Sequence, residues 1–129
     1  MFTKKIAGCI IIENNQILLL KKKTKSWWEI PGGTMLAEET PEETAIREMK
    51  EELLCDIELL SLYQENEFIH KGNTAYATWF IAKIKNEQRP RMGEPEEFSD
   101  MKFFNLEDLD SIYLSPNVQK MLLSMELQE

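Results

Sequence analysis

Cysteine is scarce in this sequence. Cys9 and Cys55 are the only two cysteines among 129 residues, and they lie in separate apolar stretches without a C-x-x-C pair. This pattern favours two small, buried hydrophobic residues in a protein of a reducing compartment, and we expect the cytoplasm. A structural or catalytic thiol is the less favoured alternative.

Long hydrophobic runs are also missing. An apolar run follows Lys4 and Lys5, but Glu13, Asn14 and Asn15 end it too early for a signal peptide. No other stretch approaches the roughly 20 apolar residues of a membrane-spanning helix, so a membrane is not an expected partner. Hydrophobic residues make up 43% and charged residues 29%, which is typical of a globular protein. The length predicts a single domain over residues 1–129.

Basic residues are outnumbered by acidic ones. Fifteen Lys and Arg face 23 Asp and Glu, which gives a net charge of −8. An acidic surface repels the phosphates of a nucleic acid polymer, so we do not expect such a partner. A small phosphorylated ligand remains compatible if divalent cations bridge it to carboxylates. The sequence is compatible with either a monomer or a homodimer.

The hydrophobic pattern predicts strands and helices in mixed order. Strands are expected at residues 6–12, 17–20, 27–30, 57–69, 74–84 and 101–104, helices at 40–53 and 115–126, and a helical turn at 106–109. Residues 31–33 and 70–73 are predicted to be short loops, and 86–100 a long polar loop. Strands before and after an internal helix, with a second helix at the end, predict an α/β layered domain with a mixed sheet.

The first predicted helix has a strong start signal. Thr40 is the expected N-cap, Pro41 fits the first helical position, and Glu43 can complete a capping box. At about 100° per residue, one arc of this helix forms a core-facing stripe. That stripe consists of Ala45, Ile46, Met49 and Leu53.

Three glutamates share a second arc of this helix. Glu48, Glu51 and Glu52 lie within about 100° of one another, with Arg47 and Lys50 on the remaining side. Like charges raise one another's pKa, and no lysine lies within the arc, so a bound cation is expected. Mg²⁺ suits a few carboxylates and completes its shell with water and phosphate oxygens. The alternative is an ordinary acidic face in contact with solvent.

The wider pattern over residues 33–55 resembles the box of the Nudix hydrolase family. That box reads G-x5-E-x7-R-E-U-x-E-E-x-G-U, where U is a bulky aliphatic residue. The chain supplies Gly33, Glu39, Arg47, Glu48, Met49, Glu51 and Glu52, with Cys55 in place of the last aliphatic. Residues 28–33 and 103–106 extend the resemblance over most of the chain. It implies an α/β/α sandwich whose loop–helix–loop box holds divalent metal ions.

The resemblance also implies roles for the residues of the box. Glu48, Glu51 and Glu52 would bind Mg²⁺, or Mn²⁺ in its place, directly or through water, and the carbonyl of Gly32 would be a further ligand. Because the water-activating base varies across the family, Glu48 is one choice among several.

Arg47 and Glu39 would support each other and orient the metal-binding helix, the alternative being a surface salt bridge of little energetic value. Many members of the family add a carboxylate from the loop before the late aromatic strand. In this chain the loop contains Glu94, Glu96 and Glu97, and counting back from Phe103 favours Glu97 as a metal ligand. The alternative is that these loop acids only face solvent.

Leu54 departs from the pattern, because it stands where the box has glycine. Glycine after a helix permits a left-handed cap, which costs leucine about 1–2 kcal/mol. We therefore expect either a longer helix or a shifted exit loop. The carboxylates lie before Leu54 in the sequence, so the chemistry is expected to be retained.

The candidates for substrate binding are lysines, a tryptophan and an asparagine. Lys21, Lys22 and Lys23 are candidates for phosphate contact, or else solvated charges at a strand end.

Trp27 is a candidate to stack on a base, although Trp27 and Trp28 could also be core residues on the two faces of a strand, and at least one is expected in the core. Asn117 is a candidate to read a base edge, with local helix capping as the alternative.

The family attacks a pyrophosphate linkage with water. The resemblance implies cleavage of a phosphoanhydride in a nucleoside diphosphate derivative, with a MutT-like nucleoside triphosphate, oxidised or not, as the favoured substrate. ADP-ribose-type members usually carry a proline after the box, where this chain has Lys71 and its neighbours. Alternatives are a dinucleoside polyphosphate or nucleotide-sugar hydrolase, a non-catalytic nucleotide-sensing Nudix domain, and a purely structural acidic domain.

Overall fold

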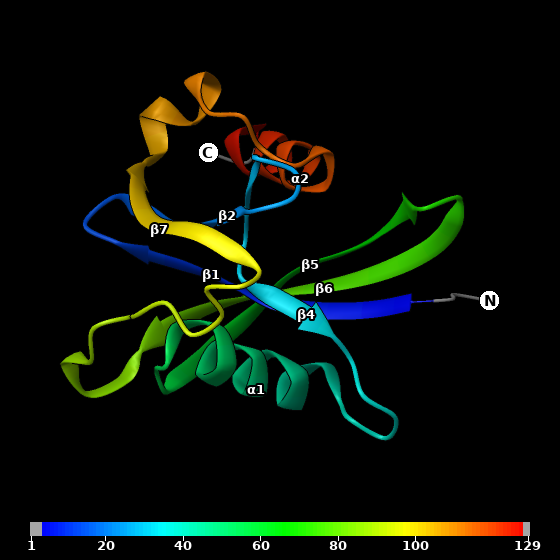
Figure 1. Ribbon diagram of the computed structural model, residues 1–129, viewed down its shortest axis with the longest axis horizontal. Coiled ribbons are helices and arrows are strands. Elements are labelled where there is room, and N and C mark those ends of the chain that lie inside the picture. The colour runs from blue at the N-terminus through cyan, green and yellow to red at the C-terminus, as the bar shows by residue number, and fades with distance from the viewer. Residues whose placement is uncertain (1–3, 128–129) are drawn as a thin grey trace.

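A mixed seven-stranded sheet forms the centre of the molecule (Figure 1). The computed structural model describes residues 4–127, so residues 1–3 and 128–129 of the expected domain lie outside the described part. The strands are β1 (Lys4–Glu13), β2 (Gln16–Lys22), β3 (Trp28–Glu29), β4 (Gly32–Thr34), β5 (Ile57–His70), β6 (Asn73–Ile84) and β7 (Phe98–Asn105). The helices are α1 (Pro41–Leu53), α2 (Pro116–Leu127) and the 3-10 helices η1 (Lys85–Glu87) and η2 (Leu106–Ser111).

The sheet divides along β1. Over residues 4–11 this strand pairs in parallel with β6, and residues 6–8 also pair with β4 on its other edge. Only its last residues, Ile12 and Glu13, pair with β2, which continues to β3 and β7. The strands β4 and β2 therefore separate from each other along β1, which leaves room between the two parts of the sheet for the site described below.

The two faces of the sheet are covered by different helices. Figure 1 shows α1 below the sheet and α2 above it. One apolar core lies on the α1 side and includes Ala45, Met49 and Leu53, while a second core includes Val118 and Met121 of α2. This arrangement is the α/β/α sandwich with a mixed sheet that the sequence predicts. Among residues 4–127, no helix is long and apolar enough to cross a bilayer.

Two tight hairpins connect strands that are neighbours in the sequence. Asn14 and Asn15 have φ values of 51° and 63° and connect β1 to β2. Lys71 and Gly72 have φ values of 51° and 79° and connect β5 to β6. Positive φ at both central residues matches the twist of antiparallel strands. The second turn therefore needs two residues rather than the four predicted.

The segment expected to be a loop at residues 31–33 is partly a strand. Gly32 and Gly33 pair with Gly8 and Ala7 of β1. A Cβ on Gly32 would lie 2.6 Å from the carbonyl oxygen of Ala7, so only glycine permits this approach. The late strand β7 is also longer than predicted and begins at Phe98, because Phe98 pairs with Lys22.

Helix α1 starts where the sequence predicts. Thr40 caps it, its hydroxyl accepting from the Glu43 amide, and the Glu43 carboxylate accepts from the Thr40 amide. The predicted core stripe is wrong at Ile46, which is 42% exposed. The buried face is rotated towards Glu48 and Glu52, which are 9% and 2% exposed, because α1 packs against both β1 and β4.

The end of α1 differs from both expectations for Leu54. The helix ends at Leu53, and Leu54 itself adopts the left-handed conformation, with φ 54° and ψ 37°. Its amide donates to the Lys50 carbonyl at 3.1 Å. The expected longer helix or shifted exit loop is therefore wrong, since leucine takes the conformation that glycine would take.

The loop after η1 closes the C-terminal end of α1. The amide of Arg91 donates to the Leu53 carbonyl at 2.8 Å, and that of Gly93 donates to the Glu52 carbonyl at 2.9 Å. These donors satisfy carbonyls that a helix end leaves without partners. The loop that carries the late glutamates is thus attached to the helix that carries Glu48 and Glu52.

Candidate active site

A cavity of about 990 Å³ opens between the two parts of the sheet. It draws its lining from α1, β4, the ends of β2 and β3, the loop before β7, the β5–β6 hairpin and the start of α2. The expected site residues that line it are Lys22, Trp27, Gly32, Arg47, Glu48, Glu52, Glu97 and Asn117. Segments far apart in the sequence therefore meet in one site cavity.

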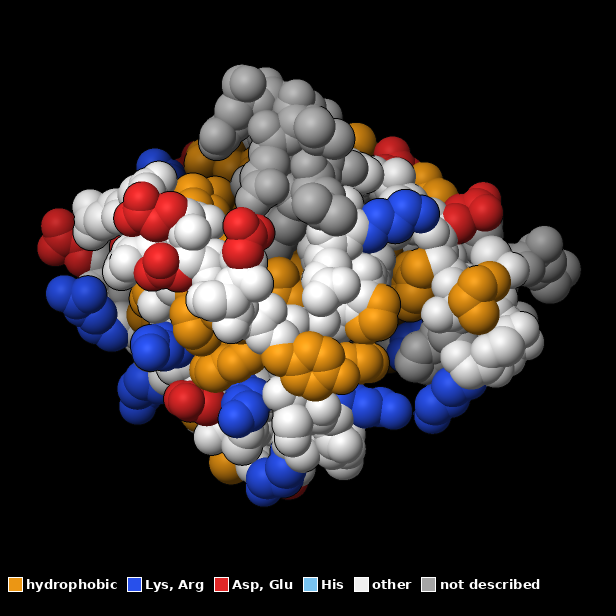
Figure 2. Space-filling view, turned by 90° about the horizontal axis from the view of Figure 1, so that it is seen from above, with side chains coloured by type: hydrophobic (Ala, Val, Ile, Leu, Met, Phe, Trp, Pro, Cys, Tyr) orange, Lys and Arg blue, Asp and Glu red, His pale blue; other side chains and the backbone are white. Residues whose placement is uncertain are grey.

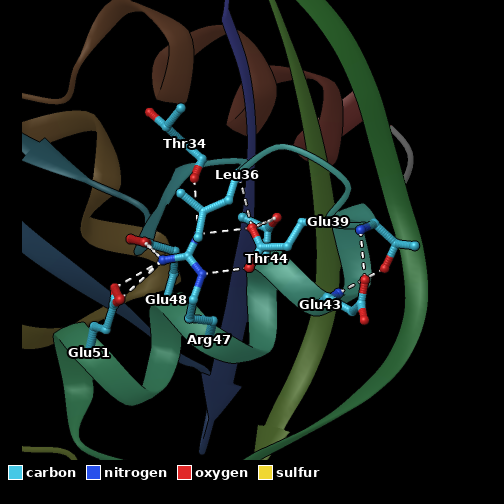
Figure 3. A network of polar contacts seen from close by, with 9 residues as sticks. Thr34, Leu36, Glu39, Glu43, Thr44, Arg47, Glu48 and Glu51 are labelled. Atoms are coloured by element: carbon cyan, nitrogen blue, oxygen red, sulfur yellow. Dashed lines mark hydrogen bonds and ion pairs between the residues drawn. The ribbon is translucent and has the colours of Figure 1, made fainter.

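Arg47 and Glu39 form the expected contact. The guanidinium donates through Nε at 2.6 Å and through Nη2 at 3.0 Å to the two carboxylate oxygens of Glu39 (Figure 3). Glu39 also accepts from the amide of Leu36 and the hydroxyl of Thr44. These donors, Arg47 first, lower the pKa of Glu39 to about 2. The pair fixes the segment before α1 onto the helix.

The same guanidinium also reaches two glutamates of the expected acidic arc. Nη1 of Arg47 lies 2.8 Å from Glu48 Oε2 and 3.0 Å from Glu51 Oε2 (Figure 3). No lysine was expected within this arc, and the cation that reaches it is Arg47 from the neighbouring side of the helix. The long arginine side chain folds along the helix to positions i+1 and i+4, which the arc of its own Cα does not reveal.

Burial dominates the electrostatics of Glu48. Its carboxylate is partly buried, and burial followed by repulsion from Glu51 raises its pKa to about 7, against the lowering effect of Arg47. A Cβ on Gly33 would collide with this carboxylate, so glycine at that position leaves room for it. Glu48 is thus a carboxyl group that changes its charge near neutral pH.

Glu52 is the most deeply buried carboxylate of the site. It is 2% exposed, and its Oε1 accepts from the amide of Gly32 at 2.8 Å. Burial, and then repulsion from Glu48, raises the pKa of Glu52 well above its usual range. Glu51, in contrast, is exposed and does not line the cavity.

The loop before β7 brings two carboxylates to the cavity. Glu97 pairs with Lys22 at 3.1 Å, and its backbone carbonyl accepts from the amide of Lys23 at 2.9 Å. Glu94 also lines the cavity, and burial followed by repulsion from Glu97 and Glu51 raises its pKa. The sequence favours Glu97 over Glu94, whereas the structure brings both to the cavity.

The donor set fits a hard divalent cation in chemistry but is not arranged as a finished metal centre. Among the side chains that the structure describes, in residues 4–69 and 71–121, no three of Asp, Glu, His or Cys converge on one point as ligands. The physical reason is that Arg47 holds Glu48 and Glu51, and the Gly32 amide holds Glu52. Crowded carboxylates whose pKa values are raised are nevertheless what a divalent cation would stabilise.

Trp28 on β3 and Trp27 immediately before it have different surroundings. Trp28 packs edge-on against Phe104, with ring centroids 4.6 Å apart, in the α2-side core. Trp27 lines the cavity, and its indole Nε1 donates to Glu29 at 2.6 Å. One tryptophan is therefore in the core, as expected, and Trp27 is available to a ligand.

Asn117 lies at the start of α2 and faces the cavity. Its Oδ1 accepts from Nδ2 of Asn66 at 3.1 Å, whereas the hydroxyl of Ser115 accepts from the Val118 amide. The side chain of Asn117 therefore bonds to β5, and local capping of α2 is the role of Ser115.

The three expected lysines separate. Lys22 lines the cavity, whereas Lys21 and Lys23 are absent from its described lining, and the Lys23 ammonium donates to the carbonyl of Pro95 at 2.9 Å. Lys25, which the sequence does not single out, also lines the cavity, with its Nζ 5.7 Å from the centroid of the Trp27 ring. Its position after β2 was visible in the sequence, but the turn that brings it to the cavity was not.

Charge is unevenly distributed over the upper face of the molecule. Figure 2 shows acidic side chains mainly at the upper left, with others at the upper right, while hydrophobic side chains form a band across the middle with basic side chains beside them. The net charge of −8 therefore does not give a uniformly acidic face. A small anion could approach parts of this surface without repulsion from every side.

Comparisons with known proteins agree with this geometry. The model of the NUDIX domain family matches residues 3–124. An 8-oxo-dGTP diphosphatase of Proteus vulgaris is 35% identical over 93 residues, covering 67% of this chain and 82% of that protein. The 8-oxo-dGTP diphosphatase of Escherichia coli (strain K12) is 29% identical over 107 residues, covering 78% and 82%.

Solved structures show the same fold. A MutT NUDIX hydrolase from Burkholderia pseudomallei superposes with a TM-score of 0.84 at 27% identity, covering 92% of this chain and 95% of that one. A C. elegans Ap4A hydrolase in a binary complex superposes with a TM-score of 0.77 at 24% identity, covering 97% and 96%, and this likeness concerns the fold alone.

Proposed function

Because the chain belongs to the NUDIX domain family and is a Nudix hydrolase, we propose that it uses Mg²⁺ to cleave a phosphoanhydride bond in a nucleoside diphosphate derivative. The favoured substrate is a nucleoside triphosphate, oxidised or not, which would give a nucleoside monophosphate and pyrophosphate. The observation that carries the proposal is the burial of Glu48 and Glu52 beside Arg47 in a cavity that also exposes Trp27 and Asn117.

The residues that would hold the ion are Glu48, Glu51, Glu52, Glu97 and the carbonyl of Gly32, and Mn²⁺ would be an alternative ion. When bound, such an ion lowers the pKa of a water and neutralises charge on a leaving phosphate. Glu48 is our choice for the group that takes the proton from the attacking water. Without a bound ion its pKa is about 7, which is in the range of a general base near neutral pH, and a bound cation would lower it.

Support for an anionic, aromatic substrate comes from the remaining lining. Lys22 and Lys25 would contact phosphate oxygens, and the pairing of Lys22 with Glu97 keeps its ammonium beside the acidic loop. Lys23, held by Pro95, is a weaker candidate than the sequence suggested. Trp27 offers a π-face for stacking on a base, and Asn117 offers an amide for its edge.

The names of the relatives support this class of substrate. Two of the relatives described above are 8-oxo-dGTP diphosphatases, and a Haemophilus influenzae relative is a dihydroneopterin triphosphate diphosphatase, which is 29% identical over 102 residues. A Methanocaldococcus jannaschii relative, 29% identical over 109 residues, is an ADP-ribose pyrophosphatase. Because the other three names are those of triphosphate hydrolases, we favour a triphosphate over a dinucleoside polyphosphate or a nucleotide sugar. We also propose a cytoplasmic location, because Cys9 and Cys55 are buried free thiols that suit a reducing compartment.

A substrate panel tests the proposal. The purified protein is incubated with Mg²⁺ and nucleoside triphosphates, 8-oxo-dGTP, a dinucleoside tetraphosphate or ADP-ribose, and the phosphate products are identified. We expect release of pyrophosphate from triphosphates, loss of this activity in Glu52→Gln, and wild-type activity in Glu42→Gln, which alters an exposed glutamate of the same helix. Nucleotide binding without turnover would instead indicate a sensing domain, and wild-type activity in Glu52→Gln would remove Glu52 from the mechanism.

A further inference from the structure

A chain of hydrogen bonds connects the sheet to Asn117. The indole Nε1 of Trp79 donates to Oδ1 of Asn66 at 3.0 Å, and Nδ2 of Asn66 donates to Oδ1 of Asn117 at 3.1 Å. Trp79 lies on β6, Asn66 on β5 and Asn117 on α2. Trp79 and Asn117 line the site cavity, whereas Asn66 is absent from its described lining.

The direction of every bond in this chain follows from the first donor. An indole N–H can only donate, and Trp79 is 3% exposed, so its N–H requires a protein acceptor. Asn66 must therefore present its oxygen to Trp79 and its NH₂ group to Asn117. Asn117 must in turn present its oxygen to Asn66. The indole alone thus fixes the orientation of both amides.

This orientation decides which atoms of the Asn117 amide face a ligand. Oxygen and nitrogen lie on opposite arms of the planar amide, so directing Oδ1 to Asn66 turns Nδ2 away from β5. Among the residues whose side chains the structure describes, 4–69 and 71–121, the Nδ2 group of Asn117 has no hydrogen-bond partner. Asn117 is thus set to donate hydrogen bonds to the occupant of the site cavity.

We propose that Asn66 is a positioning residue that fixes the amide of Asn117 as a donor, so that the site selects nucleotides whose base has a keto group over those with an amino group. This inference rests on the proposed function and names the substrate class within it. Guanine presents two neighbouring acceptors, O6 and N7, whereas adenine presents N7 beside an N6 amino donor. Thymine presents the O4 acceptor where cytosine has an amino donor, and uracil shares O4.

The site discriminates against bases with an amino group because Asn117 offers them no hydrogen-bond acceptor. Asparagine recognises adenine by donating to N7 and accepting from N6 at the same time. With Oδ1 of Asn117 directed to Asn66, the accepting half of this pair is not offered to the ligand. A keto base needs only the donor, so its hydrogen bond is retained.

The substitution Asn66→Asp gives the most direct test. The carboxylate that it introduces accepts from Trp79 and can also accept from Nδ2 of Asn117, which reverses the amide and turns its oxygen to the cavity. We measure KM and kcat with Mg²⁺ for GTP, ATP, UTP and CTP, and titrate GMP and AMP calorimetrically. Wild type should favour GTP over ATP and UTP over CTP by about tenfold in kcat/KM, mainly through KM.

The variants distinguish the direction of the hydrogen bond between residue 66 and Asn117 from structural support alone. Asn66→Asp should reverse both preferences while kcat on the preferred substrates stays near the wild-type value, and Asn66→Ala should abolish the preferences. Asn86→Asp makes the same chemical change at an exposed position away from the cavity and should leave the preferences unchanged. Far-ultraviolet circular dichroism and thermal melting report whether each variant is folded.

The possible results also distinguish this inference from the proposed function. If wild type hydrolyses triphosphates without preferring keto bases, or if Asn66→Asp is folded and keeps the wild-type preference, the inference is overturned and the function stands. If no triphosphate is hydrolysed but GMP binds more tightly than AMP and Asn66→Asp reverses the order, the function fails and the inference stands. If Asn66→Asp does not fold, the inference is tested by the wild-type preferences and by Asn66→Ala.

Discussion

Leu54 is a leucine in a conformation that glycine adopts without strain. Its φ of 54° places Cβ close to the following carbonyl, which costs about 1–2 kcal/mol for a residue other than glycine. Its side chain is 46% exposed, so little apolar burial offsets this cost. The hydrogen bonds that residues 91 and 93 donate to the end of α1 help to hold the backbone in place.

Replacement of Leu54 by glycine should therefore stabilise the protein. We expect an increase of about 1 kcal/mol in the free energy of unfolding, because relief of strain outweighs the greater freedom of glycine in the unfolded chain. Urea unfolding followed by tryptophan fluorescence measures the change. Leu54→Ala is the matched control, since alanine also loses the leucine side chain but keeps the strain. Equal stability of the two variants would contradict the strain argument.

Single residues also show where sequence reasoning reaches its limit. Thr40, Pro41 and Glu43 specify the start of α1 through neighbours in the chain, and the structure agrees with their prediction to the residue. Lys25 lines the site cavity only because distant segments meet there, so no local pattern identifies it, and the sequence places Glu94 in the acidic loop without distinguishing it as a cavity residue. The exposure of Ile46 follows from the same cause, since the orientation of α1 is decided by its contacts with the sheet.

At the scale of elements, Arg47 connects α1 to the segment that precedes it. Its guanidinium donates to both oxygens of Glu39 and to the carbonyl of Thr34 at 3.0 Å, while Nη1 faces Glu48 and Glu51 (Figure 3). A lysine has one charged nitrogen and cannot make these contacts together. The arginine therefore sets the relative position of β4, the following loop and the acidic side of the helix.

Substitution of Arg47 by lysine should lower activity more than stability. We expect a decrease of about tenfold to a hundredfold in kcat/KM or in the apparent affinity for Mg²⁺, as for other residues that orient metal ligands. Steady-state kinetics over a range of Mg²⁺ concentrations separates the two effects. Lys50→Gln alters an exposed cation of the same helix and should have wild-type kinetics. Unchanged kinetics in Arg47→Lys would reduce Arg47 to a surface ion pair.

The strands show which elements could be predicted and which could not. The hairpins β1–β2 and β5–β6 join neighbours in sequence, and their turns carry Asn and Gly, so the pattern was sufficient. The sequence predicts a loop where β4 lies, because the glycines of β4 form a strand only by pairing with the distant β1. The early start of β7 likewise depends on its pairing with the end of β2.

At the scale of the whole molecule, the buried acids make stability depend on pH. The pKa of Glu48 is about 7 in the folded protein against an ordinary value of 4.5, so its contribution to stability is fully present below about 4.5 and is lost as the pH rises through about 7. Glu39 acts in the opposite sense, since its pKa is about 2 and its contribution is lost only as the pH falls from about 4.5 through about 2.

The protein without divalent ions should therefore be more stable at pH 5 than at pH 8. Urea midpoints measured in EDTA across this range report the difference. Glu48→Gln removes one titrating carboxyl and should reduce the slope, whereas Glu42→Gln, on the exposed side of the helix, should not. A slope that is the same in Glu48→Gln and wild type would assign the pH dependence to other groups.

Mg²⁺ should raise the melting temperature of the whole molecule. An ion that binds only the folded state adds about 2.7 kcal/mol at a concentration one hundred times its Kd. Differential scanning calorimetry in Mg²⁺ and in EDTA measures the gain, which should be smaller in Glu52→Gln than in Glu42→Gln. A purely structural acidic domain predicts no such gain.

The parallel pairing of β1 with β6 affects how the chain is made. Lys4 pairs with Ala75, so β1 cannot pair with β6 until the ribosome has added the residue 71 positions later in the sequence. At about 5–20 residues per second, a ribosome needs about 4–14 s to add those residues. During that interval the apolar stretch Ala7–Ile11 has no β6 to pair with, so a newly made protein of this kind would benefit from a chaperone that covers its first strand until translation passes β6.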